Sequence, residues 1–244
     1  LVPLHSIGNQ VWVDINNNGI IDGGEAPVAG VEVVLHYVDP VSGTCIIVGT
    51  VFTDANGLYL FDSLIGGNYI VEIPSSNFGL GQPLAGFASS TGNGALIGTD
   101  SATDPDNNAD GDDNGLLNGN PMFVGSVVSD TLTLGNNEPL NEVPNNDTSG
   151  ALDSNSNLTV DFGFIPLMSI GNQVWNDANN NGVFDAGELP IAGVEVVLHY
   201  INPLTGTCDI LYTTTTDANG LYLFDSLIQG SYIVELPGSN FAPG

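Results

Sequence analysis

Residues 31–37 read Val-Glu-Val-Val-Leu-His-Tyr, and the fold is decided in this stretch. Apolar side chains occupy every second position, at Val31, Val33, Leu35 and Tyr37. Successive side chains of a β-strand point to opposite faces of the sheet, so this two-residue period predicts a strand with one buried face.

Short apolar segments separated by turns continue on the C-terminal side. Residues 45–53, 58–61 and 69–73 read as further strands, and Gly, Pro, Asn and Asp gather in the turns between them. No segment shows a convincing helical period. We therefore predict an all-β domain whose strands form two packed sheets, as in an Ig-like sandwich.

Residues 75–120 interrupt this pattern with a long stretch rich in Gly, Ser, Asn and Asp. Residues 122–134 and 158–164 then resume the pattern, and we expect them to be the last two strands. A long excursion inside a compact domain is usually functional or disordered.

The chain also repeats itself. Residues 6–12, Ser-Ile-Gly-Asn-Gln-Val-Trp, recur unchanged as residues 169–175, and 53 of the 73 positions from 6–78 are identical to those in 169–241. Such similarity indicates a recent duplication. We predict a complete repeat at residues 1–163 and the N-terminal half of a second repeat at residues 164–244, which we expect to continue beyond this stretch.

No Gly/Ser-rich linker separates the two copies. Residues 158–164 lead through Ile-Pro-Leu-Met directly into the second Ser-Ile-Gly. A junction without a flexible linker predicts stiffly coupled neighbours, so the first partners we expect are neighbouring repeats of the same chain.

The charge of the chain is one-sided. It has 28 Asp and Glu residues, no Lys or Arg, and a formal net charge of -28. Nucleic-acid binding is excluded because it depends on Lys and Arg, and anionic membrane surfaces are disfavoured for the same reason. No apolar run could span a bilayer, so we expect no membrane insertion. Bound cations or a cationic partner must balance the acidic groups.

Residues 14–25, Asp-Ile-Asn-Asn-Asn-Gly-Ile-Ile-Asp-Gly-Gly-Glu, match the twelve-residue calcium loop of EF-hands at its diagnostic positions. Calcium requires six to eight hard oxygen ligands, and Gly at position six permits the sharp turn. The predicted ligands are Asp14, Asn16, Asn18, the backbone carbonyl of Ile20, Asp22 and Glu25.

The second copy carries the same pattern. Its predicted calcium ligands are Asp177, Asn179, Asn181, the carbonyl of Val183, Asp185 and Glu188. The first loop is not expected to lie between helices, because strand-like Val11-Trp12 enters it and Ala26-Pro27 follows it. We expect the ion to fix a strand connection rather than to act as a sensor.

A second acidic cluster lies in residues 100–115. Its carboxylates repel one another unless cations sit among them, so we expect one or more further calcium ions there. The alternative is a solvated acidic loop. The predicted ligands are Asp104, Asp106, Asn108, Asp110 and Asp112, and Asp147, Asp153 and Asp161 are possible remote ligands.

Several motifs together resemble one family. Residues 8–12, the loop at 14–25, residues 27–35 and 53–61, and the closing segment at 157–164 resemble the SdrD B-like domains, which are relatives of the collagen-adhesin B-type (Cna-B) sandwich. The resemblance implies calcium-binding β-sandwich repeats that form rigid stalks on bacterial surface proteins. The Lys–Asn crosslink of some related domains is impossible here, because the chain has no Lys.

The function that we expect is a calcium-stabilised structural or adhesive repeat in a stalk or filament of a large secreted, cell-surface protein. The alternative is a carbohydrate- or protein-binding module that uses the excursion at 75–120. We find no catalytic motif and expect no enzyme activity. Cys45 and Cys208 lie one repeat apart and cannot pair with each other in an extended chain. Each is expected to be a small buried apolar residue, or to link to another copy of the chain in a bundle.

Overall fold

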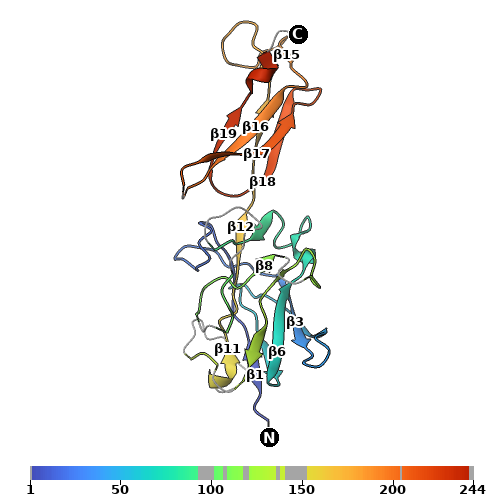
Figure 1. The fold of residues 1–244 in the computed structure, drawn as a ribbon, viewed down its shortest axis with the longest axis vertical. Coiled ribbons are helices and arrows are strands. Elements are labelled where there is room, and N and C mark those ends of the chain that lie inside the picture. The colour runs from blue at the N-terminus through green and yellow to red at the C-terminus, as the bar shows by residue number, and fades with distance from the viewer. Residues whose placement is uncertain are drawn as a thin grey trace. The chain divides into compact units, whose positions relative to one another are not determined.

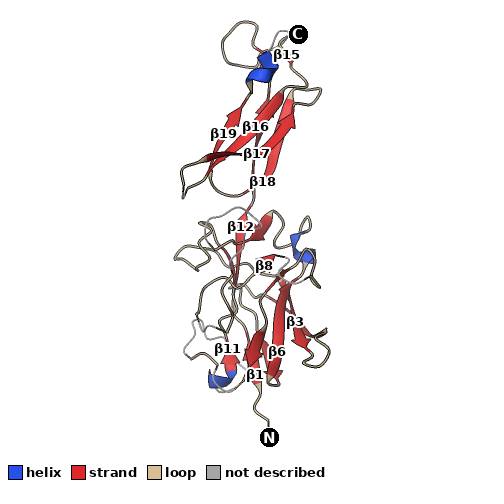
Figure 2. Cartoon of the chain, viewed as in Figure 1, coloured by secondary structure: helices blue, strands red, loops and turns tan. Residues whose placement is uncertain are grey.

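The computed structural model describes residues 2–92, 102–106, 109–117, 121–135, 138–140, 153–203 and 205–241 of the chain. These residues form strands joined by turns, with three short 3-10 helices and no α-helix among them (Figure 2). The predicted all-β class is therefore confirmed. None of the helices in these ranges is long and apolar enough to cross a membrane.

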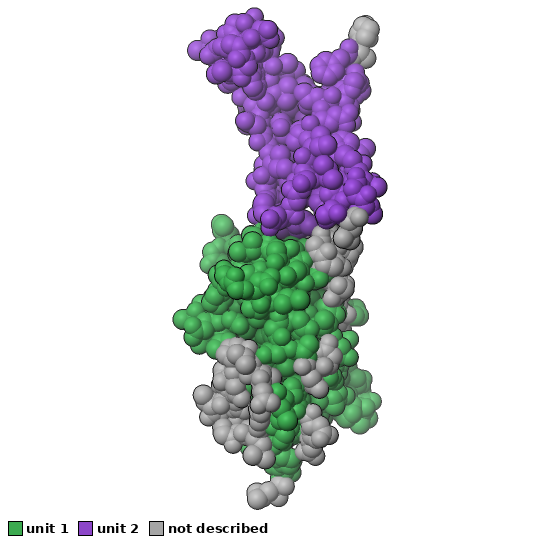
Figure 3. Space-filling view, turned by 90° about the vertical axis from the view of Figure 1, so that its left-hand side faces the viewer, with its two compact units in different colours: residues 1–166 green, residues 167–244 purple. Residues whose placement is uncertain are grey.

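The chain divides into two compact units (Figure 3), Leu1–Pro166 and Leu167–Gly244. We call them unit 1 and unit 2. The repeat boundary predicted from the sequence, between residues 163 and 164, falls inside the last strand of unit 1.

Unit 1 contains twelve strands in its described residues (Figure 1), and the two 3-10 helices are η1 (Ser75–Phe78) and η2 (Asp153–Asn155). The strands are β1 (His5–Ile7), β2 (Val11–Val13), β3 (Glu32–Val38), β4 (Cys45–Phe52), β5 (Phe61–Leu64), β6 (Gly67–Ile73), β7 (Phe87–Ser89), β8 (Leu116–Leu117), β9 (Val127–Val128), β10 (Leu132–Leu134), β11 (Ser156–Asn157) and β12 (Phe162–Pro166).

These strands build a sandwich. One layer is a six-stranded sheet in the order β4-β3-β6-β9-β8, with β10 also paired to β6. The opposite layer contains two three-stranded sheets, β11-β1-β5 and β2-β12-β7. Val33 and Leu35 of β3 point into the core, where they meet side chains of the second layer such as Phe162 and Phe164. The alternation in residues 31–37 thus places its apolar side chains between the layers.

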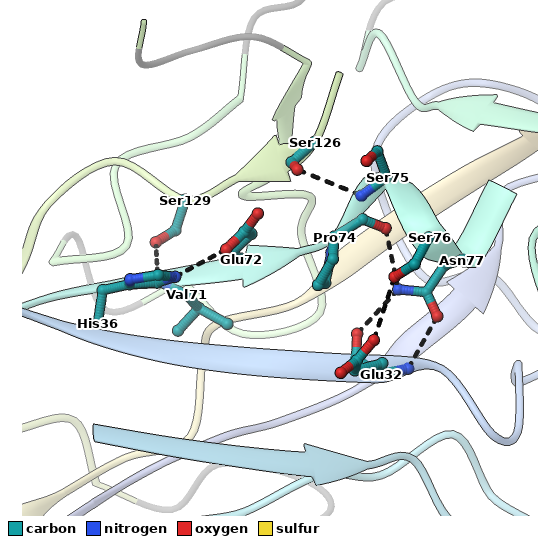
Figure 4. Close-up of polar contacts among 10 residues, drawn as sticks. All are labelled: Glu32, His36, Val71, Glu72, Pro74, Ser75, Ser76, Asn77, Ser126 and Ser129. Carbon is teal, nitrogen blue, oxygen red and sulfur yellow. Dashed lines mark hydrogen bonds and ion pairs between the residues drawn. The ribbon is translucent and has the colours of Figure 1, made fainter. Parts of the chain in front are cut away.

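The expected strand at residues 122–134 is divided in two. β9 pairs with the end of β6 and β10 with its start, and Ser129 lies between them. The Ser129 hydroxyl accepts a hydrogen bond from Val71 N at 3.0 Å, and Ser129 N donates to Val71 O at 2.9 Å (Figure 4). At this point Val71 N therefore bonds to a side-chain hydroxyl and not to a backbone carbonyl. This change interrupts the regular hydrogen bonding between the strands.

Unit 2 repeats the first half of this arrangement. Its strands are β13 (Met168–Gln173), β14 (Trp175–Asn176), β15 (Leu189–Pro190), β16 (Glu195–Ile201), β17 (Cys208–Thr215), β18 (Leu221–Leu227) and β19 (Ser231–Glu235), followed by the 3-10 helix η3 (Gly238–Phe241). The sheets are β13-β18, β14-β15 and β17-β16-β19.

The register of unit 2 copies that of unit 1. Val197 pairs with Glu235 as Val34 pairs with Glu72, 163 positions earlier. The described residues of unit 2 contain no strand equivalent to β9 or β12.

Candidate metal centres

The first predicted calcium loop connects two strand segments. It begins where β2 ends, and just after it Pro27 forms an isolated bridge with Trp12. In unit 2 the equivalent loop joins β14 to β15, which pair through Trp175 and Pro190. Each loop therefore closes a small hairpin and has no flanking helices.

Asp14 is the buried anchor of the first loop. Its side chain is fully buried, and its carboxylate accepts hydrogen bonds from Asn18 N at 3.2 Å and Gly19 N at 2.8 Å. Asn17 and Gly19 both have positive φ, at 57° and 73°, which is the backbone conformation that folds the loop around this carboxylate.

The other predicted side-chain ligands converge on the same loop. Glu25 accepts hydrogen bonds from Ile15 N at 2.9 Å and Asp22 N at 2.9 Å. One oxygen of Asp22 accepts hydrogen bonds from the side-chain amides of both Asn16, at 2.8 Å, and Asn18, at 2.9 Å. Hydrogen bonds within residues 14–25 thus hold each of these side chains in the loop.

The second loop makes the same bonds. Equivalent bonds join Asn181 N to Asp177 at 3.1 Å, Gly182 N to Asp177 at 2.8 Å, Ala178 N to Glu188 at 2.9 Å, Asp185 N to Glu188 at 3.0 Å, Asn179 to Asp185 at 2.9 Å and Asn181 to Asp185 at 2.7 Å. The hydrogen bonds from Asn179 and Asn181 lower the pKa of Asp185.

The donor set of each loop fits calcium. It consists of carboxylate, amide and carbonyl oxygens, the hard ligands that calcium prefers, and it contains no soft ligand. In the described part of the chain, no three His, Cys, Asp or Glu side chains form a cluster that could hold a metal by themselves. The acidic side chains of each loop alone therefore do not form a metal site, and the calcium ligand set remains a prediction from the sequence.

Segments from later in unit 1 clamp the first loop. Ser90 Oγ donates to Asp14 at 2.6 Å, and Thr91 N donates to the side chain of Asn17 at 2.8 Å. The acidic segment lies on the other side, where Ile21 N donates to Gly111 O at 2.8 Å. Sequence reasoning missed these contacts because Ser and Thr carry no motif that marks a partner about 75 residues away.

The structure separates the second predicted cluster into two groups. Asp104 accepts from Asp106 N at 3.0 Å, and Asp106 accepts from Thr133 N of β10 at 2.9 Å. Burial raises the pKa of Asp106. Asn108, like Asp147, lies outside the described residues, and Asp153 begins η2.

Asp110 and Asp112 instead lie beside Asp161, which is fully buried where the chain enters β12. Asp161 accepts hydrogen bonds from Gln10 N at 2.7 Å and Gly111 N at 3.0 Å. Burial raises its pKa well above the ordinary value, and the charges of Asp110 and Asp112 add to this effect.

Like Asp161, Asp112 has a raised pKa. Burial raises its pKa, with Asp110 adding to the rise, and its Oδ1 atom is buried with no hydrogen-bond partner. Carboxylates in this condition are unfavourable without a nearby cation. The neighbouring Asp113 is also buried, but it accepts from Gly115 N at 3.1 Å and Gly163 N at 2.9 Å, so its role is structural.

His36 is a buried polar residue of β3. It is buried under Phe123, with ring centroids 4.7 Å apart, and its Nε2 lies 2.7 Å from Glu72 (Figure 4). Glu32, on the same strand, contacts Ser76 and Asn77 instead. Among the described residues neither cysteine forms a disulfide; Cys45 is half-buried, and Cys208 is exposed rather than buried.

Comparisons with known proteins agree with the sequence motifs. The profile of the SdrD B-like domain matches residues 5–114 and 168–242. Serine-aspartate repeat-containing protein F of Staphylococcus epidermidis is 32% identical over 234 residues, which cover 95% of this chain and 11% of that protein. Serine-aspartate repeat-containing protein E of Staphylococcus aureus (strain USA300) is 31% identical over 234 residues, which cover 95% of this chain and 15% of that protein. The chain thus spans a small fraction of these relatives.

Solved structures show weaker similarity. A streptococcal ancillary pilin aligns with a TM-score of 0.36 and 13% identity, over 95% of this chain and 52% of that one. The minor pilin of Streptococcus agalactiae aligns with a TM-score of 0.34 and 11% identity, over 96% and 83% of the two chains.

Proposed function

The chain belongs to the SdrD B-like domain family, and from that premise we propose that it is a spacer of a bacterial surface stalk or filament, braced by bound calcium. The proposal assigns no reaction to the chain. It places the chain outside the cell, in a larger adhesive protein, with neighbouring repeats and other copies of the chain as its partners.

The observation that carries this proposal is the duplicated loop. Two loops 163 positions apart share both their oxygen-bearing residues and their hydrogen bonds, while intervening residues such as Ile15 and Ala178 differ. Five oxygen-bearing side chains gather in each loop of a chain that has no Lys or Arg. A divalent cation would balance the negative charge of these side chains.

Calcium supplies positive charge and rigid oxygen coordination when it is bound. The residues of the chain would fix the position of the bound ion. The first loop fixes the end of β2 to Pro27, and it is tied to the closing half of the repeat through Ser90 and Gly111. Gly111, which contacts the first loop, lies between Asp110 and Asp112, and the charges of these two residues add to the raised pKa of Asp161. A cation in the first loop would hold the two halves of the sandwich together.

The junction between the copies suits a spacer. β12 ends at Pro166 and β13 begins at Met168, so one residue separates the last strand of unit 1 from the first strand of unit 2. A short connection limits the freedom of neighbouring repeats, which supports a stalk rather than a flexible tether.

The alternative, a binding module built on residues 75–120, has less support. In its described part, β7 pairs with β12, and Asp112 and Asp113 pair with the first loop and with Asp161. These residues therefore serve the fold of the repeat.

The proposal is tested by metal analysis of the purified chain after dialysis against calcium. We expect at least two calcium ions per chain, and two fewer in a variant that carries Glu25→Gln and Glu188→Gln, because each loop loses a charged ligand. The control carries Asp62→Asn and Asp225→Asn, which make the same change in charge outside the loops. A chain without calcium, or equal losses in both variants, would overturn the proposal.

A further inference from the structure

A hollow of about 300 Å³ opens on unit 2 between β17 and β18, the edge strands of two different sheets. This volume is at the lower end of the range of small-ligand sites, about 300–1,000 Å³. The lining residues used below are Tyr212, Thr214, Leu223, Phe224, Asp225 and Ser226.

A β-bulge lies on each side of the hollow. In β17, Tyr212 pairs with Leu198 while Ile210 pairs with His199, so Leu211 is the additional residue. In β18, the register also shifts, and Ser226 has a positive φ of 56°. Bulges redirect side chains and are frequent beside functional sites.

The equivalent place in unit 1 has different chemistry. Gly49 and Val51 stand where unit 2 has Tyr212 and Thr214. A Cβ atom at Gly49 would lie 3.0 Å from the ring of Phe61, so a tyrosine would not fit there without a shift of that ring.

The two walls of the hollow have diverged at different rates. Residues 219–228 are identical to 56–65 at all ten positions, whereas residues 208–216 match 45–53 at only four of nine. The differences between the two copies are therefore concentrated in β17, which carries Tyr212. On the opposite side of the hollow, Asp225 and Ser226 are the same residues as in unit 1.

We propose that this hollow binds a Lys or Arg side chain of a partner protein. Tyr212 is 48% exposed and lines the hollow, and an aromatic ring can bind a cation on its face. Asp225 and Leu223 line the same hollow, where a carboxylate and an apolar side chain suit a cation on an alkyl stem. The net charge of -28 repels anionic ligands and attracts cationic ones. These 244 residues contain no Lys or Arg, so the cation must come from outside them.

The test is an NMR titration of the calcium-loaded chain with N-acetyl-arginine amide. N-acetyl-citrulline amide, which has a similar shape and no charge, is the control ligand. We expect saturable shifts of the backbone amides of Tyr212, Thr214 and Ser226 with the arginine compound, and much weaker binding of the citrulline compound. Equal binding of the two, or binding of methyl glucoside at the hollow without binding of arginine, would overturn the proposal.

Variants separate this pocket from the general attraction of an acidic protein. Tyr212→Gly restores the residue of unit 1 without a change of charge, and we expect it to weaken arginine binding by about fivefold. Asp225→Asn should weaken binding, whereas Asp62→Asn, the same change at the equivalent position of unit 1, should not. If the two Asp variants weaken binding equally, the attraction is non-specific and the proposal is wrong.

Discussion

At the scale of single residues, Gly57 shows how closely the backbone of the repeat is packed. It has a φ of 73° in the turn before β5, and its carbonyl accepts a hydrogen bond from Val11 N at 2.8 Å. A Cβ atom there would lie 2.4 Å from Val11 O. The sequence predicts the turn, but not the strand that presses against it.

Gly57→Ala should therefore destabilise unit 1 severely, by roughly 3 kcal/mol or more, because steric overlap with backbone atoms adds to the strain of the positive φ. Gly43→Ala is the matched control. Gly43 has a similar φ of 69°, with open space around its Cβ position, so about 1 kcal/mol is expected. Urea unfolding measures both variants, and equal losses would contradict the packing described for Gly57.

The pair of His36 and Glu72 predicts a pH dependence. Burial tends to raise the pKa of Glu72, but hydrogen bonds from His36 and Ser126 and the charge of His36 outweigh burial and lower it below the ordinary value of 4.5. The unfolded chain then binds more protons near that pH, so Glu72 stabilises the fold above it. This contribution is lost as the pH falls through the lowered pKa.

Glu72→Gln should consequently lower the melting temperature at pH 6, and the difference from the unaltered chain should shrink below pH 4.5. Glu235→Gln is the control in unit 2, where the equivalent pair is more exposed and a smaller effect is expected. A difference that grows towards acid pH would show that the sign of this contribution is wrong.

At the scale of elements, the two predicted calcium loops have different surroundings in the described residues. Asp14 is fully buried and bonded to Ser90, whereas the second loop is largely exposed and has no such contacts among the described residues. A site held in place by its neighbours loses less conformational freedom when it binds an ion. In these 244 residues, which do not include the equivalent of Ser90 for the second loop, the first loop should therefore bind calcium more tightly.

Calcium titrations of Asp14→Asn and Asp177→Asn, each of which leaves one loop intact, measure this difference. We expect the first loop to bind about tenfold more tightly than the second, since site rigidity tunes calcium affinity. Ser90→Ala should reduce that advantage without an effect on the second loop. Equal affinities, or a tighter second loop, would show that the clamp does not organise the site.

The elements also show where prediction from sequence succeeds. β3 follows from its apolar period, and β4 and β6 follow from short apolar segments between turns, because these signals are local. The division of residues 122–134 does not follow, because it depends on Ser129 binding Val71 of a distant strand. The acidic segment could be recognised by its composition, but its separation into a group near β10 and a group near Asp161 is set by tertiary contacts.

At the scale of the whole molecule, the net negative charge is the main influence on stability. A net charge of -28 without Lys or Arg means that the compact state carries strong self-repulsion unless cations bind. After removal of calcium, the melting temperature should rise steeply with sodium chloride, which screens the acidic groups. With calcium bound, the dependence on salt should be weaker. A salt dependence that calcium does not alter would argue against this view.

The repeat, the all-β class and the family were accessible from sequence because each rests on local patterns present twice. The contacts between the first loop and the closing half were not, since Asp14 and Asp161 are partnered by residues tens of positions away. The hollow beside Tyr212 was also missed, because a Gly-to-Tyr difference between copies has no meaning until Phe61 and Phe224 are placed.

The central claim is that calcium braces the repeat. The most direct test is thermal unfolding of the chain, first stripped with a chelator and then supplied with calcium or magnesium at constant ionic strength. Binding at two or more sites should raise the melting temperature by about 10 °C or more with calcium, and much less with magnesium. An unchanged melting temperature, together with no bound calcium, would contradict the account.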